Sequence, residues 1–159
     1  MDYLTRGARC RTILLVEDTL DDEQLVLRSL GRVSFPILTK IARDGAQALD
    51  VLQLEYLPEE RTCARPDLVI CDIKLPKLTG DEVLRHVRCD PALKTVPFVM
   101  FSSSDEASDV ERCRNHGCDG YVVKPVDYRR FTQAVQSIVE HYLFRNAEAA
   151  RPPEAVLWA

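Results

Sequence analysis

The feature that most limits what this chain can fold into is a series of short apolar runs, each followed by polar residues. The runs are ILLV before Glu17 and Asp18, LVIC before Asp72, FVMF before Ser102, and YVV before Lys124. Segments with apolar residues at helical spacing lie between them. Strands that are apolar on both faces are typical of a parallel sheet covered by helices on both sides. The pattern therefore predicts an α/β fold.

Five strands are expected to alternate with five helices. The strands are expected at 12–16, 35–41, 68–71, 97–101 and 120–123. The helices are expected between Thr19 and Gly31 and at 45–56, 81–87, 105–116 and 127–143. Thr19 is predicted to cap the first helix, with Asp22 completing a box-like start, and Gly117 to end the fourth. Right-handed crossovers favour the strand order 2-1-3-4-5, so the expected architecture is a flavodoxin-like (βα)5 doubly wound parallel sheet.

Length, charge and cysteine content narrow the functional class. The 159 residues fit one domain with a single core, and the formal charge of −4 argues against nucleic acid as a partner. No apolar stretch is long enough for a bilayer and the N-terminus lacks the apolar core of a signal peptide, so a cytoplasmic protein without a membrane partner is expected. The six cysteines form no CxxC pair, which predicts reduced thiols, with a redox role for Cys113 and Cys118 as the alternative.

The polar residues at the ends of the runs predict a metal-dependent phosphoryl site. The carboxyl ends of parallel strands meet at one edge of an open sheet. Glu17 and Asp18 are adjacent carboxylates whose mutual repulsion calls for a cation, and hard oxygen ligands favour Mg²⁺. Asp72 carries a carboxylate that can attack phosphorus as a nucleophile. Lys124 and Ser102 supply a positive charge and a hydroxyl for the phosphoryl oxygens.

Four segments carry a resemblance to a known family. They are LLVED at 14–18, LVICDIKLPKLTG at 68–80, VPFVMFSSSD at 96–105 and GYVVKP at 120–125. In their order and spacing, the chain resembles a two-component response-regulator receiver domain of the chemotaxis-regulator type over about residues 10–143. The resemblance implies a phospho-accepting signalling protein rather than a turnover enzyme, with a histidine kinase as its partner.

The resemblance assigns roles to the acidic residues. Asp72 is the implied phospho-acceptor, matching the aspartate of the LVICD segment. Glu17 and Asp18 are the implied Mg²⁺ carboxylates. Asp72 and the main-chain carbonyl of Lys74 are implied to complete the protein ligands of the ion.

The same resemblance implies a conformational switch. Ser102 and Lys124 are implied to bind the phosphoryl group, and Tyr121 falls on the aromatic switch position. Phosphorylation of Asp72 would draw Ser102 toward it and let Tyr121 turn inward, which changes the surface made by the fourth helix, the fifth strand and the fifth helix. A cis peptide bond between Lys124 and Pro125 is also implied.

Further features resemble a narrower group within this family. The connection at 57–66 is longer than in minimal receivers. This connection, the RCDPALKTVPF segment and the helix beyond Tyr142 resemble the single-domain regulators that pair with bacterial and cyanobacterial phytochrome kinases. A bacteriophytochrome is then the implied kinase. Residues 1–144 are expected to form the receiver domain, and 145–159 a tail that contacts a partner or frays. A homodimer would form through this tail or through the switch surface.

Two other function classes stay open. A haloacid-dehalogenase-type phosphatase also begins with an aspartate at a strand end, but it has a second aspartate two residues later, where this chain has Lys74. A non-phosphorylated pseudo-receiver would act only as a binding module. The complete set of acidic, hydroxyl and lysine residues at the strand ends favours phosphorylation over this second alternative.

Overall fold

The computed structural model describes residues 10–54 and 65–144. In these ranges, five strands alternate with five helices, as the apolar runs predict. The strands are β1 (Arg11–Val16), β2 (Ile37–Ala42), β3 (Leu68–Cys71), β4 (Phe98–Ser102) and β5 (Gly120–Val123). The helices are α1 (Leu20–Leu30), α2 (Gly45–Leu54), α3 (Gly80–Cys89), α4 (Ala107–Asn115) and α5 (Tyr128–Leu143). The expectations for the tail at 145–159 and for most of the connection at 57–66 lie outside the described residues.

The sheet has the predicted topology. All strands are parallel and lie in the order β2-β1-β3-β4-β5. Val16, the last residue of β1, is paired with Ala42 of β2 on one side and with Cys71 of β3 on the other. The chain thus runs from β1 to β2 on one side and returns past β1 to β3 on the other, and sheets of this kind bind ligands beyond the strand ends at such a switch point.

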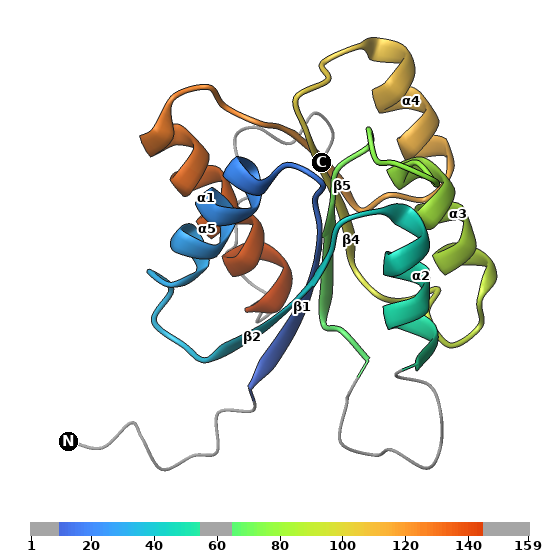
Figure 1. The fold of residues 1–159 in the computed structure, drawn as a ribbon, viewed down its shortest axis with the longest axis horizontal. Coiled ribbons are helices and arrows are strands. Elements are labelled where there is room, and N and C mark those ends of the chain that lie inside the picture. The colour runs from blue at the N-terminus through green and yellow to red at the C-terminus, as the bar shows by residue number, and fades with distance from the viewer. Residues whose placement is uncertain (1–9, 55–64, 145–159) are drawn as a thin grey trace.

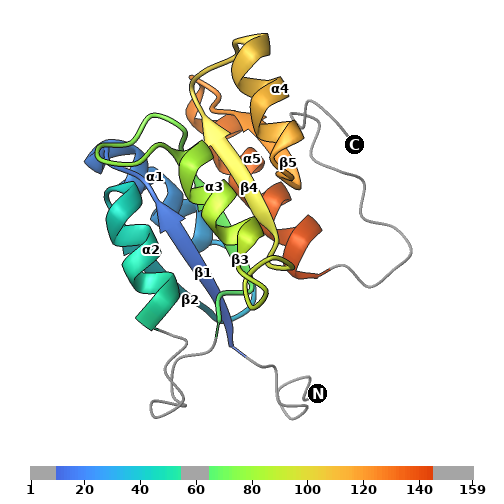
Figure 2. The same cartoon turned by 90° about the vertical axis from the view of Figure 1, so that its right-hand side faces the viewer.

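Helices cover both faces of the sheet, which explains why the strands are apolar throughout. Helices α1 and α5 lie on one face and α2, α3 and α4 on the other (Figure 1), and Figure 2 looks onto the second of these faces. Successive residues of β1 alternate between the two cores: Leu14 and Val16 belong to the core under α2, α3 and α4, and Ile13 and Leu15 to the core under α1 and α5.

The start of α3 is built to lie close to the end of β3. The Thr79 side chain accepts a hydrogen bond from the Glu82 N–H, and the Glu82 side chain accepts one from the Thr79 N–H, a capping box that begins the helix earlier than the predicted 81–87. Gly80 donates its N–H to the Ile73 carbonyl at 2.8 Å. A β-carbon at position 80 would overlap the Asp72 carbonyl oxygen, so glycine is required for this approach.

The ends of α1 and α4 differ in part from expectation. Thr19 occupies the N-cap position of α1, but its side chain makes no capping hydrogen bond and Asp22 does not complete a box. Instead, the Thr19 N–H donates to Glu17 Oε1 at 3.1 Å. Gly31 ends α1 in a right-handed conformation with φ of −64°. Gly117, predicted to end α4, follows that helix with φ of +88°, a conformation that favours glycine.

Thiol burial and helix hydropathy bear on two of the expectations from composition. The five described cysteines are free thiols, and burial raises the pKa of Cys113 and of Cys118 to about 12. Both thiols are therefore protonated at neutral pH, which disfavours the redox alternative. Across residues 10–54 and 65–144, no helix combines the length and the apolar character needed to cross a membrane.

Candidate functional site

The polar residues predicted from the strand ends meet at one edge of the sheet. Glu17 follows β1, Asp72 follows β3, Ser102 is the last residue of β4, and Lys124 follows β5. The main-chain N–H of Lys124 donates to the Ser102 carbonyl at 2.8 Å, and that of Asp72 donates to Val16 at 3.0 Å. The ladder hydrogen bonds of the sheet thus extend to the first residues of the site and hold them in register.

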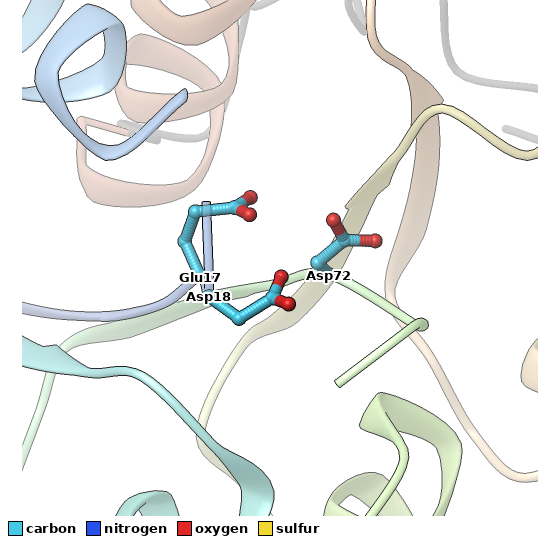
Figure 3. A group of neighbouring side chains, drawn as sticks. All are labelled: Glu17, Asp18 and Asp72. Carbon is cyan, nitrogen blue, oxygen red and sulfur yellow. The ribbon is translucent and has the colours of Figure 1, made fainter. Parts of the chain in front are cut away.

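Three carboxylates converge where β1 and β3 end. The carboxylate oxygens of Glu17, Asp18 and Asp72 lie within 4.8 Å of one another. Figure 3 shows the carboxylates of Glu17 and Asp18 turned toward Asp72. Glu17 and Asp72 are buried, whereas Asp18 is exposed and faces the solvent side of the group. Hard oxygen donors with an open side fit a Mg²⁺ ion that keeps some of its water ligands.

Lys124 is the positive charge at the centre of the site. Its ammonium donates to Glu17 Oε2 at 2.6 Å, to Asp22 Oδ2 at 2.7 Å and to Asp72 Oδ2 at 2.8 Å. Asp22 was not foreseen in this role, because its position in the first turn of α1 indicated a helix cap. The available signal was its place in the first turn of α1, four residues after Asp18.

Burial and the neighbouring charges shift the pKa values of Glu17 and Lys124. Burial raises the pKa of Glu17 to about 6, although the hydrogen bond from Lys124 opposes this shift. Burial alone would lower the pKa of Lys124, but the nearby charge of Asp72 and the hydrogen bonds to its three acidic partners raise it above its ordinary value. Lys124 is therefore an ammonium at any physiological pH, and Glu17 is the carboxyl whose charge depends on conditions near neutrality.

The Asp72 carboxylate is held by both of its oxygens. Oδ1 accepts the Ile73 N–H at 2.7 Å and Oδ2 accepts the Lys124 ammonium at 2.8 Å. Its backbone is held by β1 on one side and by the close approach of Gly80 on the other. A carboxylate fixed in this way is oriented toward an incoming group without further rearrangement.

The residues of the predicted switch are buried next to the site. Ser102 and Tyr121 are both fully buried. The Tyr121 hydroxyl donates to the Ser104 carbonyl at 2.7 Å, and Ser102 Oγ accepts the Ser104 N–H at 3.2 Å. Tyr121 thus already occupies the inward position to which the sequence-based hypothesis had it turn.

A polar network that sequence reasoning missed continues from Ser104 into α4 and α3. The Ser104 hydroxyl donates to Asp109 at 2.6 Å, and this hydrogen bond lowers the pKa of Asp109. Arg112 donates to Asp109 at 2.7 Å and to Asp81 at 3.1 Å, and the His116 ring lies 2.5 Å from Asp81. Arg112 and Asp109 lie three residues apart on α4, a local pairing, but no local pattern predicts the contacts of Ser104 with α4 or of Arg112 and His116 with Asp81 on α3. They link the position of α4 to the loop that follows Ser102.

Of two further expectations from the resemblance, one is wrong and the other stays a prediction. The Lys124–Pro125 peptide bond is trans, so the expected cis bond is wrong. The trans form is favoured by about 0.5–1 kcal/mol in X–Pro bonds, and Lys124 reaches its three carboxylates with this bond trans. The Lys74 side chain is exposed, and the metal-binding role of its main-chain carbonyl stays a prediction.

Comparison with known proteins places this geometry in a family. Residues 13–136 match the family model of the response regulator receiver domain. Response regulator Rcp1 of Synechocystis sp. (strain PCC 6803) is 32% identical over 84% of this chain and 89% of its own length. The probable methanogenesis regulatory protein FilR2 of Methanothrix harundinacea is also 32% identical, over 84% of each chain.

Solved structures agree with the sequence relatives. The phosphorylated cyanobacterial phytochrome response regulator RcpA superimposes with a TM-score of 0.77 at 32% identity, covering 84% of this chain and 94% of its own. The Mn²⁺-bound form of Rcp1 gives 0.75 at 30% identity over 87% and 97%. The bacteriophytochrome response regulator AtBRR gives 0.65 at 39% identity over 80% and 91%. Receiver domains are signalling proteins rather than classical enzymes, and this chain belongs to the response regulator receiver domain family.

Proposed function

We propose that this protein accepts a phosphoryl group on Asp72 from a phosphorylated histidine of a kinase, with Mg²⁺ at the site. The observation that carries the proposal is the buried Asp72 carboxylate, oriented by the Ile73 N–H and sharing the Lys124 ammonium with Glu17. Receiver domains partner with histidine kinases. A haloacid-dehalogenase-type phosphatase, one alternative from the sequence, is incompatible with the family assignment.

In the proposed transfer, the residues of the chain orient the reactants and balance charge. An Asp72 oxygen forms the new bond to phosphorus, and the phosphorus–nitrogen bond of the kinase phosphohistidine breaks, with its electron pair remaining on the imidazole nitrogen. The Lys124 ammonium, already within hydrogen-bond distance of Asp72, would move its hydrogen bond to a phosphoryl oxygen. The Ser102 hydroxyl is the second donor proposed for these oxygens.

Glu17, Asp18 and Asp72 are the residues proposed to hold the metal ion, with the main-chain carbonyl of Lys74 as a further ligand. When bound, Mg²⁺ would neutralise negative charge on the phosphoryl oxygens and on the three carboxylates. The fit of an all-oxygen donor group to a hard cation supports this assignment. The Mn²⁺-bound form of the relative Rcp1 supports it independently.

The proposed signal leaves the site through Ser102 and Tyr121. A phosphoryl group on Asp72 that accepts a hydrogen bond from the Ser102 hydroxyl would fix the loop that carries Ser104. The carbonyl of Ser104 accepts the hydrogen bond of the Tyr121 hydroxyl. Phosphorylation would then stabilise the buried position of Tyr121 and the packing of α4 against that loop. The surface of α4, β5 and α5 is the proposed output, as an interface for a target or for a second copy of the chain.

The kinase partner is proposed to be of the phytochrome type. Several of the similar structures are described as phytochrome or bacteriophytochrome response regulators, among them RcpA, AtBRR and RtBRR. We place the protein in the cytoplasm, with residues 1–144 as its receiver domain. The tail at 145–159 is proposed to contact a partner or to form a dimer.

Acid-labile labelling tests the proposed acceptor. Asp72→Asn keeps the shape of the side chain and removes its nucleophilic charge, so labelling by a phosphorylated histidine kinase or a small-molecule phosphodonor with Mg²⁺ should be lost. Asp50→Asn, an exposed aspartate on α2, is the matched control and should be labelled like the unmodified protein. Labelling that persists in Asp72→Asn would rule out this acceptor, and an unlabelled unmodified protein would favour the pseudo-receiver alternative.

A further inference from the structure

The three carboxylates that bind Lys124 are not equivalent. Glu17 and Asp72 also belong to the acidic group that can hold a metal ion, whereas Asp22 lies outside that group. Asp22 comes from the first turn of α1 and reaches the ammonium across the site, with 2.7 Å between Asp22 Oδ2 and Lys124 Nζ. A cation at the metal site would therefore compete with Lys124 for Glu17 and Asp72, but not for Asp22.

The side chains of the same three residues also differ in how much of their surface is exposed. The side chains of Glu17 and Asp72 are 2% and 10% exposed, and that of Asp22 is 30% exposed. The Lys124 side chain itself is 6% exposed, so it depends on protein partners rather than on water for its charge. If a metal ion took Glu17 and Asp72, Asp22 would be the carboxylate still paired with the ammonium.

We infer that Asp22 is a positioning residue that holds the Lys124 ammonium at the edge of the site, so that Glu17 and Asp72 are available to a divalent cation. The inference rests on the proposed function for its consequence in phosphoryl transfer. Its direct effect is on cation binding, which is measured without any phosphodonor. Without the Asp22 charge, Lys124 relies more strongly on Glu17 and Asp72, and the cation must displace it against this stronger pairing.

The test is a titration of Mg²⁺ alone into the full chain and two variants. Asp22→Asn keeps the side-chain shape and removes the charge. Mg²⁺ affinity should then weaken by about threefold or more, the lower end of the coupling found between residues in direct contact. Asp21→Asn is the matched control, because Asp21 lies in the same helical turn, is exposed, and makes no ion pair within the described part of the chain. It reports the effect of removing one charge from this turn without contact to Lys124.

A second pair of variants separates contact from long-range charge. In a Lys124→Met background, the Asp22→Asn change should alter Mg²⁺ affinity no more than Asp21→Asn does, because its route through the ammonium is gone. Asp22→Glu should recover part of the lost affinity in the unmodified background. Equal weakening by Asp22→Asn and Asp21→Asn, or equal weakening with and without Lys124, would overturn the inference. Labelling of the unmodified protein at Asp72 tests the proposed function separately. The proposed phosphorylation and the inference about Asp22 can therefore fail independently of each other.

Discussion

Replacing Lys124 by Met should destabilise the protein through charge rather than through packing. Methionine keeps an unbranched side chain of similar length, so the contacts of the lysine stem are largely retained. What is lost is the ammonium that neutralises Glu17 and Asp72, whose side chains are 2% and 10% exposed. Two buried carboxylates would then face each other without a counter-charge.

The magnitude follows from this burial. Removing one partner of a buried ion pair costs about 3–5 kcal/mol. We expect the lower end, about 3 kcal/mol at pH 8, because Asp22 is partly solvated and a carboxyl such as Glu17 can take up a proton. Burial already raises the pKa of Glu17 above its ordinary value, and the variant loses the ammonium that opposes this shift, so stability is lost as pH rises. The difference from the unmodified protein should therefore shrink toward pH 5.5.

The assay is urea unfolding followed by far-UV circular dichroism, in EDTA and in excess Mg²⁺. Lys77→Met is the matched control, since Lys77 is 67% exposed and lies 3.3 Å from Asp44, and its loss should change stability by less than about 1 kcal/mol. Excess Mg²⁺ should stabilise Lys124→Met more than the unmodified protein, because the ion supplies the missing counter-charge. If Lys124→Met in EDTA is as stable as the control, or gains nothing from Mg²⁺, the electrostatic account of the site is wrong.

Two further predictions concern metal affinity and backbone packing. Mg²⁺ affinity measured by calorimetry should fall as pH drops through about 6, because burial raises the pKa of Glu17 to about 6 and a protonated carboxyl is a poor ligand; an unchanged affinity down to pH 5 would contradict this. Gly80→Ala should lower the free energy of unfolding by about 2 kcal/mol or more and slow labelling, because the added methyl overlaps the Asp72 carbonyl oxygen. Gly31→Ala is its control in thermal denaturation, since Gly31 has a right-handed backbone and ordinary contacts, and equal effects of the two changes would refute the packing argument.

Much of the fold could be predicted because its signals are local. The apolar runs LVIC and GYVV coincide with the central strand β3 and the edge strand β5, since the residues of both strands are almost all buried and leave uninterrupted apolar sequence. The edge strand β2 was predicted at 35–41 but lies at Ile37–Ala42, because its half-buried residues give a weaker pattern. The strand order followed from the handedness of crossovers rather than from any residue.

The polar contacts show where local reasoning ends. Asp22 was interpreted as part of a helix cap, although it pairs with Lys124 from the other end of the chain. The expected cis bond before Pro125 depended on resemblance alone, and the bond is trans. The contacts between α3 and α4, such as Arg112 with Asp81, have no sequence signature because they depend on how two helices pack.

The sequence by itself determined the α/β alternation, the parallel sheet and the edge at which Glu17, Asp18, Asp72, Ser102 and Lys124 would gather. These follow from hydrophobic periodicity and from the polarity of strand ends, both of which are properties of neighbouring residues. Only the tertiary structure decided that Lys124 is shared by three carboxylates, one of them on α1, and that Tyr121 is buried against the Ser104 loop. Those pairings depend on distances between elements far apart in the chain, which packing of the helices on the sheet sets and the local pattern does not encode.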